Sequence, residues 1–188
     1  MIGAYLNERF RPAVFLPLAG FIALAASAGR IDAARLAADA IFALLLLAEF
    51  RLWDDLADRD ADAVQHPDRV LVKSRSIGAF TLVREGLTAT NLMGCVIRTG
   101  AHVTLPVLLA LHAMLSAWYA VRSRRSIAGD QLLLAKYPAF VVIVAGARGL
   151  AEPVPVALAA LLVYAAASLY EAWHDPASPV AALLGGRS

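Results

Sequence analysis

Long apolar stretches alternate with short polar connections along most of the chain. A transmembrane helix needs about 20 predominantly apolar residues. The pattern predicts six transmembrane helices, at residues 10–28, 33–53, 77–97, 102–121, 130–146 and 156–173. The chain is therefore expected to be an all-α integral membrane protein that forms one domain over residues 1–188.

The composition agrees with that prediction. Hydrophobic residues make up 60% of the chain and charged residues 17%, and the mean hydropathy is +0.66, which is too apolar for an ordinary soluble domain. The net charge is only +2 and the basic residues are spread among the connections, so a nucleic-acid partner is not expected. A single cysteine excludes an internal disulfide and a cysteine-rich metal site.

One long polar segment, residues 51–75, interrupts the apolar pattern with the sequence RLWDDLADRDADAVQHPDRVLVKSR. Its aspartate-rich part, residues 54–75, is predicted to be a cytoplasmic loop. If the preceding helix continues through it, Asp55, Asp58 and Asp62 lie on one helical face. Carboxylates in that arrangement suit Mg²⁺, which takes oxygen ligands and is usually completed by water and substrate phosphates. The three aspartates are the predicted catalytic and metal-binding residues.

Basic residues follow these aspartates closely. Arg69, Lys73 and Arg75 are predicted to hold the outer oxygens of a phosphate or diphosphate, Arg as a planar fork and Lys as a compact charge. Pro67 favours a turn that brings Asp68 and Arg69 back over the aspartates. The alternative interpretation is a solvated loop whose opposite charges pair with one another and bind nothing.

The run DDLADRDAD followed by HPDRVL resembles the first aspartate-rich motif of the UbiA superfamily of intramembrane prenyltransferases. That motif usually reads Asn-Asp-x-x-Asp-x-x-x-Asp and is followed by His-Pro-x-Arg-Pro. Asp54 stands where the family usually has Asn, and Val70 replaces the second proline. The matching positions are Asp55, Asp58, Asp62, His66, Pro67 and Arg69. YLNERFRP and WYAVRSRR are weaker similarities to other parts of the family, and together the pieces span about three quarters of the chain.

A second, shorter acidic pattern closes the sixth predicted helix in the sequence YEAWHDPAS. Glu171 and Asp175 are four residues apart and share a helical face. The resemblance implies that they are a reduced second aspartate-rich motif and help to bind the substrate, as does Asp54. The alternative is a polar helix end that Asp175 and Pro176 terminate.

The resemblance implies a UbiA-like helical bundle that lacks the last helices and performs Mg²⁺-dependent transfer of a prenyl group. The prenyl group would pass from an isoprenoid diphosphate to a lipophilic acceptor in the membrane, with Asp39 or Tyr119 near the acceptor. Because the chain is short for this family, three alternatives stay open. It is a minimal enzyme completed by homodimerisation, a non-catalytic protein that binds an isoprenoid or lipid, or a membrane subunit of a larger complex.

The basic residues also predict an orientation, because cytoplasmic connections carry an excess of Lys and Arg. One side of the membrane gathers Arg9, Arg11, Arg59, Arg69, Lys73, Arg75, Arg122, Arg124 and Arg125, and the other has Arg30, Arg35, Arg98 and Arg148. Both termini and the aspartate-rich loop are therefore expected in the cytoplasm. The Ala- and Arg-rich composition suggests a bacterial inner membrane. Asp39 and Glu49 lie within the second predicted span, where a carboxylate is costly and is a functional candidate by default.

Overall fold

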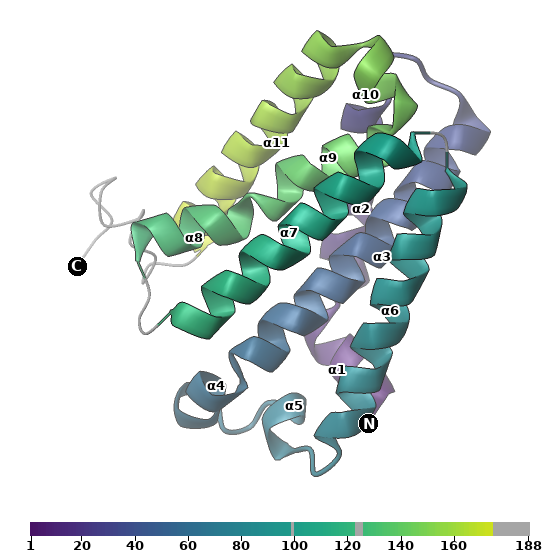
Figure 1. Ribbon diagram of the computed structural model, residues 1–188. Coiled ribbons are helices and arrows are strands. Elements are labelled where there is room, and N and C mark those ends of the chain that lie inside the picture. Colours follow the sequence, from purple (N-terminus) through teal and green to yellow (C-terminus); the bar gives the residue numbers. More distant parts are fainter. Residues whose placement is uncertain (99, 123–125, 175–188) are drawn as a thin grey trace.

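The computed structural model describes residues 1–98, 100–122 and 126–174 of the chain. That part is helical and contains no strand (Figure 1). Its helices are α1 (Ile2–Arg9), α2 (Pro12–Ala26), α3 (Ala33–Ala57), α4 (Arg59–Gln65), α5 (Val70–Lys73), α6 (Ile77–Ile97), α7 (Ala101–Val121), α8 (Ile127–Leu134), α9 (Lys136–Ala145), α10 (Ala147–Ala151) and α11 (Pro153–His174). The predicted residues Arg124, Arg125 and Asp175 lie outside the described residues.

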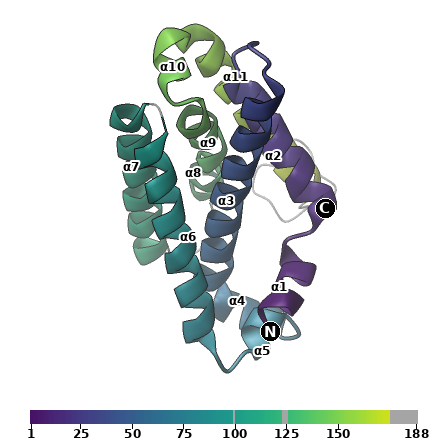
Figure 2. The ribbon, with the colours of Figure 1, turned by 90° about the vertical axis from the view of Figure 1, so that its right-hand side faces the viewer.

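The long helices form one bundle around α9, which packs against α2, α3, α7 and α11 (Figures 1 and 2). Phe140, Ile143 and Val144 of α9 are completely buried and form the middle of the main hydrophobic core. A second, smaller core of Tyr5, Leu52, Leu71 and Phe80 joins α1, α3, α5 and α6. This smaller core fixes the polar segment after α3 against the bundle.

Three helical segments are long and apolar enough to cross a membrane: α7, the combined α8 and α9, and α11. The pair α1 and α2, bent by 71°, makes a fourth if it is one span. The prediction of an all-helical fold is thus confirmed, and three or four of the six predicted spans are long and apolar enough to cross a membrane. The two other long helices carry charges within their length, Asp39 and Glu49 in α3 and Arg84 and Glu85 in α6.

The buried carboxylate of Glu49 shows how α3 accommodates such charges. Glu49 is completely buried, and it accepts hydrogen bonds from Thr88 Oγ1 and Asn91 Nδ2 of α6, both at 2.6 Å. Nε2 of His112 in α7 lies 2.7 Å from the same carboxylate. Burying a charge is expensive unless it is paired and hydrogen-bonded, so these contacts hold α3, α6 and α7 together.

The fifth predicted span is not one straight helix. It consists of α8 and α9, which meet at Ala135. Pro138, in the first turn of α9, has no backbone N–H to donate to the carbonyl of Leu134, so one helical hydrogen bond is missing near this junction. Lys136, at the start of α9, lies in the interior of the protein.

The connection before α7 depends on Gly100, which has φ of +96°. A Cβ atom there would collide with the backbone of Gly146 and Ala147, so the connection lies directly against the end of α9 and the start of α10. Both the left-handed backbone conformation and the lack of space require glycine.

We expect Gly100→Ala to lower the free energy of unfolding by about 3 kcal/mol, because it adds left-handed strain and forces the backbone apart. Gly86→Ala is the matched control, since no atom lies within 4 Å of its added Cβ and Ala favours helix. Thermal unfolding in detergent would compare the two variants with the wild type. Equal melting temperatures for the two variants would contradict the close approach at Gly100.

Candidate functional site

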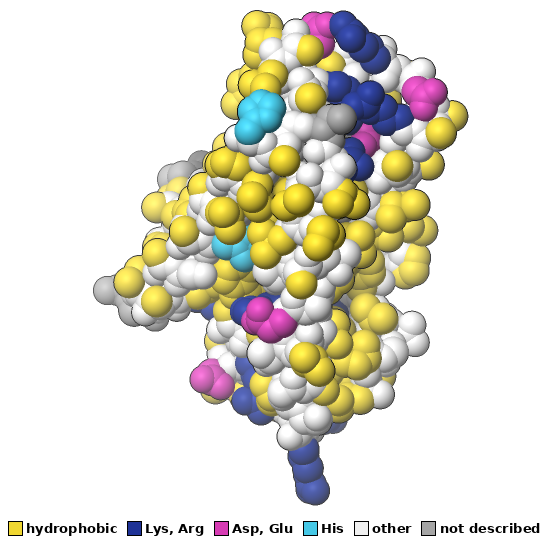
Figure 3. Space-filling view, turned by 45° about the vertical axis from the view of Figure 1, so that its right-hand side comes forward, with side chains coloured by type: hydrophobic (Ala, Val, Ile, Leu, Met, Phe, Trp, Pro, Cys, Tyr) yellow, Lys and Arg dark blue, Asp and Glu magenta, His cyan; other side chains and the backbone are white. Residues whose placement is uncertain are grey.

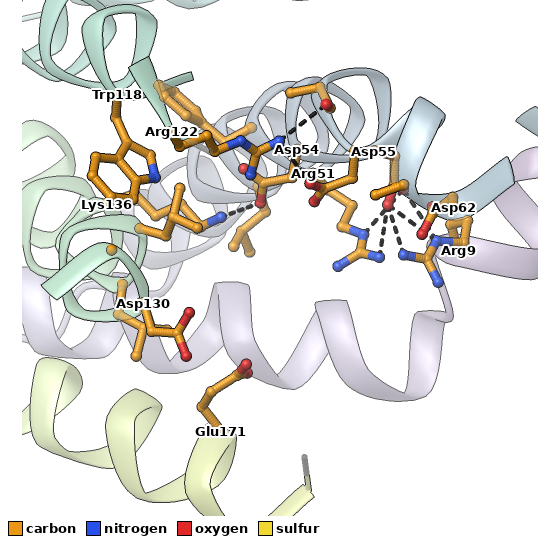
Figure 4. Close-up of a pocket in the computed structure, with 18 of the residues that line it drawn as sticks. Arg9, Arg51, Asp54, Asp55, Asp62, Trp118, Arg122, Asp130, Lys136 and Glu171 are labelled. Carbon is orange, nitrogen blue, oxygen red and sulfur yellow. Dashed lines mark hydrogen bonds and ion pairs between the residues drawn. The ribbon is translucent and has the colours of Figure 1, made fainter. Parts of the chain in front are cut away.

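A cavity of about 800 Å³ lies where α3 ends, and its walls differ in polarity (Figure 4). Charged side chains from α1, α3, α4, α8, α9, α11, the end of α7 and the segment before α5 line one part of it. Phe15, Leu47, Phe50, Leu133 and Phe140 line another part. Such a cavity suits a ligand with a charged head and an apolar tail.

Asp54 lies on the cavity wall between two partners from distant parts of the chain. Its Oδ2 atom forms an ion pair with Nζ of Lys136, and its Oδ1 atom accepts a hydrogen bond from the hydroxyl of Tyr119. The Lys136 side chain is 9% exposed and that of Asp54 17%. The pair therefore joins the end of α3 to α7 and α9 in a poorly solvated place.

Asp55 points to the other side of α3 and has the largest set of partners. Nη2 atoms of Arg9 and Arg51 lie 2.6 and 2.9 Å from its Oδ1 atom, and the Tyr5 hydroxyl donates to Oδ2 at 2.8 Å. This carboxylate is almost completely buried. It ties α1 to α3 and lies beside the cavity with its two arginines (Figure 4).

Asp58 marks the point where α3 stops and α4 begins. Its carboxylate accepts a hydrogen bond from Nη2 of Arg122 at 2.6 Å, and the same nitrogen donates to the Ala57 carbonyl. Burial raises the pKa of Asp58 above its usual value, although the Arg122 guanidinium acts in the opposite direction. Asp58 therefore takes up a proton at a higher pH than a free aspartate does.

The turn at Pro67 separates the two residues that were predicted to return over the aspartates. Arg69 does return and forms an ion pair with Asp62. Asp68 instead faces solvent, where it pairs with Lys73 at 2.6 Å, and this contact lowers the pKa of Asp68. The turn therefore brings a cation to the cavity and leaves the carboxylate outside.

The structure brings most of the predicted site residues together. The members that line the cavity are Asp54, Asp55, Asp58, Asp62, Arg69 and Glu171. Lys73 and Arg75 are exposed and do not line it. Asp175 lies outside the described residues, so the proposed second motif is represented in the cavity by Glu171 alone.

Several residues at the cavity were not expected there from the sequence. They are Arg9, Arg51, Trp118, Arg122, Asp130 and Lys136. The sequence could have indicated only one of them, Arg51. It precedes Asp55 by four residues, so the two side chains lie on the same helical face. Asp130 and Glu171 lie on the opposite side of the cavity from the aspartates of α3 (Figure 4).

Trp118 presents an unusual polar atom at this cavity. Its indole Nε1 is buried and has no hydrogen-bond partner in the described protein, although Trp118 lines the cavity. The indole lies tightly against Gly129, where an added Cβ would collide with the ring. A buried donor without a partner costs about 1–3 kcal/mol, so a ligand that accepts this hydrogen bond would recover that energy.

The donor set is chemically suited to Mg²⁺, because it consists of carboxylate oxygens. Within the described ranges no group of three His, Cys, Asp or Glu is arranged to hold a metal ion by itself. Mg²⁺ needs only one or two carboxylates when substrate phosphates complete its coordination. Asp54 and Asp58, one helical turn apart on the cavity wall, meet that requirement.

Comparisons of the chain with protein-family models, with curated proteins and with solved structures gave no match.

We expect Lys136→Met to lower the free energy of unfolding by about 3 kcal/mol, because it leaves a poorly solvated Asp54 without its counter-charge. Lys73→Met is the control, since its ion pair with Asp68 is exposed and should change stability little. Unfolding in detergent would measure both. The double variant Asp54→Asn/Lys136→Met should recover stability, and failure to do so would contradict this explanation.

Proposed function

We propose that the protein transfers a prenyl group from an isoprenoid diphosphate to a lipophilic acceptor in the membrane. The observation that carries the proposal is the cavity, in which paired charges lie next to an apolar wall. A diphosphate head and an isoprenoid tail have the same division of polarity. The resemblance of residues 54–69 to the aspartate-rich motif of the UbiA superfamily supports this substrate class.

The charge of the cavity supports a role for Mg²⁺ in binding. Among the described residues its lining contains six carboxyl groups, those of Asp54, Asp55, Asp58, Asp62, Asp130 and Glu171, against five cationic groups, those of Arg9, Arg51, Arg69, Arg122 and Lys136. A diphosphate that entered alone would add negative charge to a lining that is already slightly acidic. A divalent cation that accompanies it corrects this imbalance.

Asp58, one of the three predicted ligands, would hold Mg²⁺ together with Asp54 and the substrate phosphates. The other two predicted ligands, Asp55 and Asp62, are paired with Arg9 and Arg69 and would stay beside the bound complex. When bound, the ion neutralises the diphosphate and makes it a better leaving group. Arg69 and Arg122 would contact the outer oxygens of the diphosphate, because guanidinium groups bind such oxygens in pairs. Glu171 lies on the opposite side of the cavity and would contact the bound complex from there.

The apolar wall would hold the prenyl chain and keep water away. Phe50 and Phe140 are completely buried, and their ring centroids lie 5.1 Å apart. Exclusion of water protects an allylic cation from hydrolysis. Tyr119 donates a hydrogen bond to Asp54, and Trp118 lines the cavity. We place the acceptor beside these two residues. Asp39, the other predicted acceptor contact, does not line this cavity.

We also infer how the chain sits in the membrane. Six long helices would cross a bacterial inner membrane, with the cavity and both termini on the cytoplasmic side. The basic residues near the cavity favour this orientation, and soluble diphosphates and Mg²⁺ are present there. Lys73 and Arg75 lie outside the cavity and would guide the anionic substrate toward it.

A second candidate function is binding of an isoprenoid or lipid without catalysis, by this chain alone or as a subunit of a larger complex. It is favoured by the ion pairs at Asp54, Asp55, Asp58 and Asp62, each of which already has a cationic partner. Such pairs balance the buried charge without a ligand. A substrate complex would have to replace some of these contacts before any reaction.

Asp58→Asn should reduce the Mg²⁺-dependent stabilisation of the purified protein by a prenyl diphosphate. A ligand that binds the folded state raises the melting temperature by mass action, and the variant removes a predicted metal ligand. Asp60→Asn is the matched control, because Asp60 lies in the same segment, is fully exposed and does not line the cavity. The melting temperature would be measured with and without Mg²⁺ at several prenyl chain lengths.

The outcomes distinguish the two functions. Binding together with release of diphosphate supports prenyl transfer, whereas binding without consumption in the presence of membrane extracts favours the non-catalytic function. If prenyl diphosphates of every length leave the melting temperature unchanged, prenyl transfer is ruled out, and so is non-catalytic binding of a prenyl diphosphate. An equal response of the Asp58→Asn and Asp60→Asn variants would remove the assignment of Asp58.

Trp118→Phe should weaken binding of the same ligand about five-fold, because it removes a donor that has no partner within the described protein. The ligand-free protein should keep its melting temperature, since no internal hydrogen bond is lost. Thermal shifts at increasing ligand concentration would give the apparent affinity. Unchanged affinity would show that the indole N–H does not contact the ligand.

A further inference from the structure

A second cavity, of about 180 Å³, lies near the connections at the other end of the bundle. It is lined by Arg35, Ala38, Asp39, Arg98, Val144 and Ala145, which come from the first turns of α3, the end of α6 and the end of α9. Basic side chains gather on this end of the molecule, at the top in Figure 3. The arginines found there are Arg30, Arg35, Arg98 and Arg148.

The centre of this basic end is one carboxylate shared by two arginines. Asp39 is completely buried, and its two oxygens form ion pairs with Arg98 and Arg148. The Arg148 side chain is only 10% exposed. Two guanidinium groups against one carboxylate leave a positive charge without compensation, and buried charge of that kind is costly.

No other acidic group among the described residues at this end supplies the compensation. Asp32 caps α3 by accepting a hydrogen bond from the backbone N–H of Arg35 at 2.8 Å, and Glu152 forms an ion pair with Arg30. The Arg35 guanidinium lines the cavity but forms no ion pair with any residue that the structure describes. The cavity lining therefore has two arginines, Arg98 and the exposed Arg35, against one carboxylate. Arg148, which does not line the cavity, contacts the same carboxylate and adds to the positive charge.

The donors that remain are suited to an oxyanion. Only Nη2 of Arg98 contacts Asp39 and the Val144 carbonyl, while a guanidinium group has five N–H donors in a planar fork. Such forks bind the oxygens of phosphate in pairs, and they differ from ammonium groups in this respect. The cavity is large enough for a group of that size, since a water molecule occupies about 30 Å³.

The position of the cavity indicates where the anion comes from. The apolar helices α7 and α11 begin near this end, at Ala101 and Pro153, and α9 ends there at Ala145. The ends of membrane-spanning helices lie at the level of lipid headgroups, where arginine forks can bind phosphate oxygens in pairs. An anionic phospholipid would present its phosphate at the required depth.

We propose that Arg35 and Arg98, which line the cavity beside Asp39 and its second partner Arg148, form a second anion site, which binds a phosphate group of a phospholipid headgroup or free phosphate. The ligand supplies the negative charge that the single carboxylate does not provide. The site stands at a different end of the bundle from the aspartate-rich cavity and does not depend on the function proposed for that cavity. Because it contacts α3, the end of α6 and α9, an occupied site would also stabilise the bundle.

The test uses the full chain in an uncharged detergent at low ionic strength. Native mass spectrometry would measure binding of phosphatidylglycerol and of diacylglycerol with the same acyl chains, which lacks the phosphate. A separate titration would use inorganic phosphate. Arg35→Gln removes a guanidinium that has no ion pair with a described residue, so it should fold normally. Arg30→Gln is the matched control, because Arg30 is at the same end but does not line the cavity.

We expect saturable binding of phosphatidylglycerol, no comparable binding of diacylglycerol, and an affinity about ten-fold lower for Arg35→Gln, as one charge-assisted hydrogen bond predicts. Arg30→Gln should bind as the wild type does. Asp39→Asn should bind the anion more tightly, which a purely structural ion-pair cluster would not do. Saturable binding of inorganic phosphate as well would support the site and identify free phosphate as a second source. If neither ligand binds saturably, or if Arg35→Gln and Arg30→Gln bind equally, the proposal is overturned.

Discussion

The structure depends on the cost of placing carboxylates inside an apolar bundle. Helix α3 carries Asp39 near its start, Glu49 in its middle and Asp54 and Asp55 near its end, and all four are buried or nearly so. Each one is held by cationic or hydrogen-bonding groups from other helices. A buried charge without a partner would cost several kcal/mol. These contacts therefore determine which helices surround α3 and how each is positioned along the axis of α3.

The features that depend on neighbouring residues in the chain, namely the long helices and the turn at Pro67, could be predicted from the sequence. The length of the apolar stretches located the long helices. Of these, α7 and α11 are apolar enough to cross a membrane, whereas α3 and α6 carry charged residues within their length. The proline turn correctly predicted that Arg69 returns to the aspartates. The partner of Asp54 was not predictable, since Lys136 is 82 residues away and the contact depends on the packing of α9 in the bundle. Composition also gave no reason to expect two arginines on Asp39.

The balance of acidic and basic side chains differs between the two ends of α3. At the aspartate-rich end, acidic groups slightly outnumber basic groups along the described cavity lining, which favours a ligand that arrives with a metal cation. At the other end one carboxylate stands among three arginines, which favours an anion. The hydrogen-bonded and aromatic surroundings of Glu49, including His112 stacked against Trp53, separate the two along the same helix.

The contact between Trp118 and Gly129 affects the shape of the aspartate-rich cavity. The indole can lie where it does only because residue 129 has no side chain. A single methyl group at that position would move the ring and with it the only wall atom known to lack a hydrogen-bond partner within the described cavity lining. Ligand selectivity in this protein can therefore change through a residue that carries no functional group, while every charged residue of the cavity stays the same.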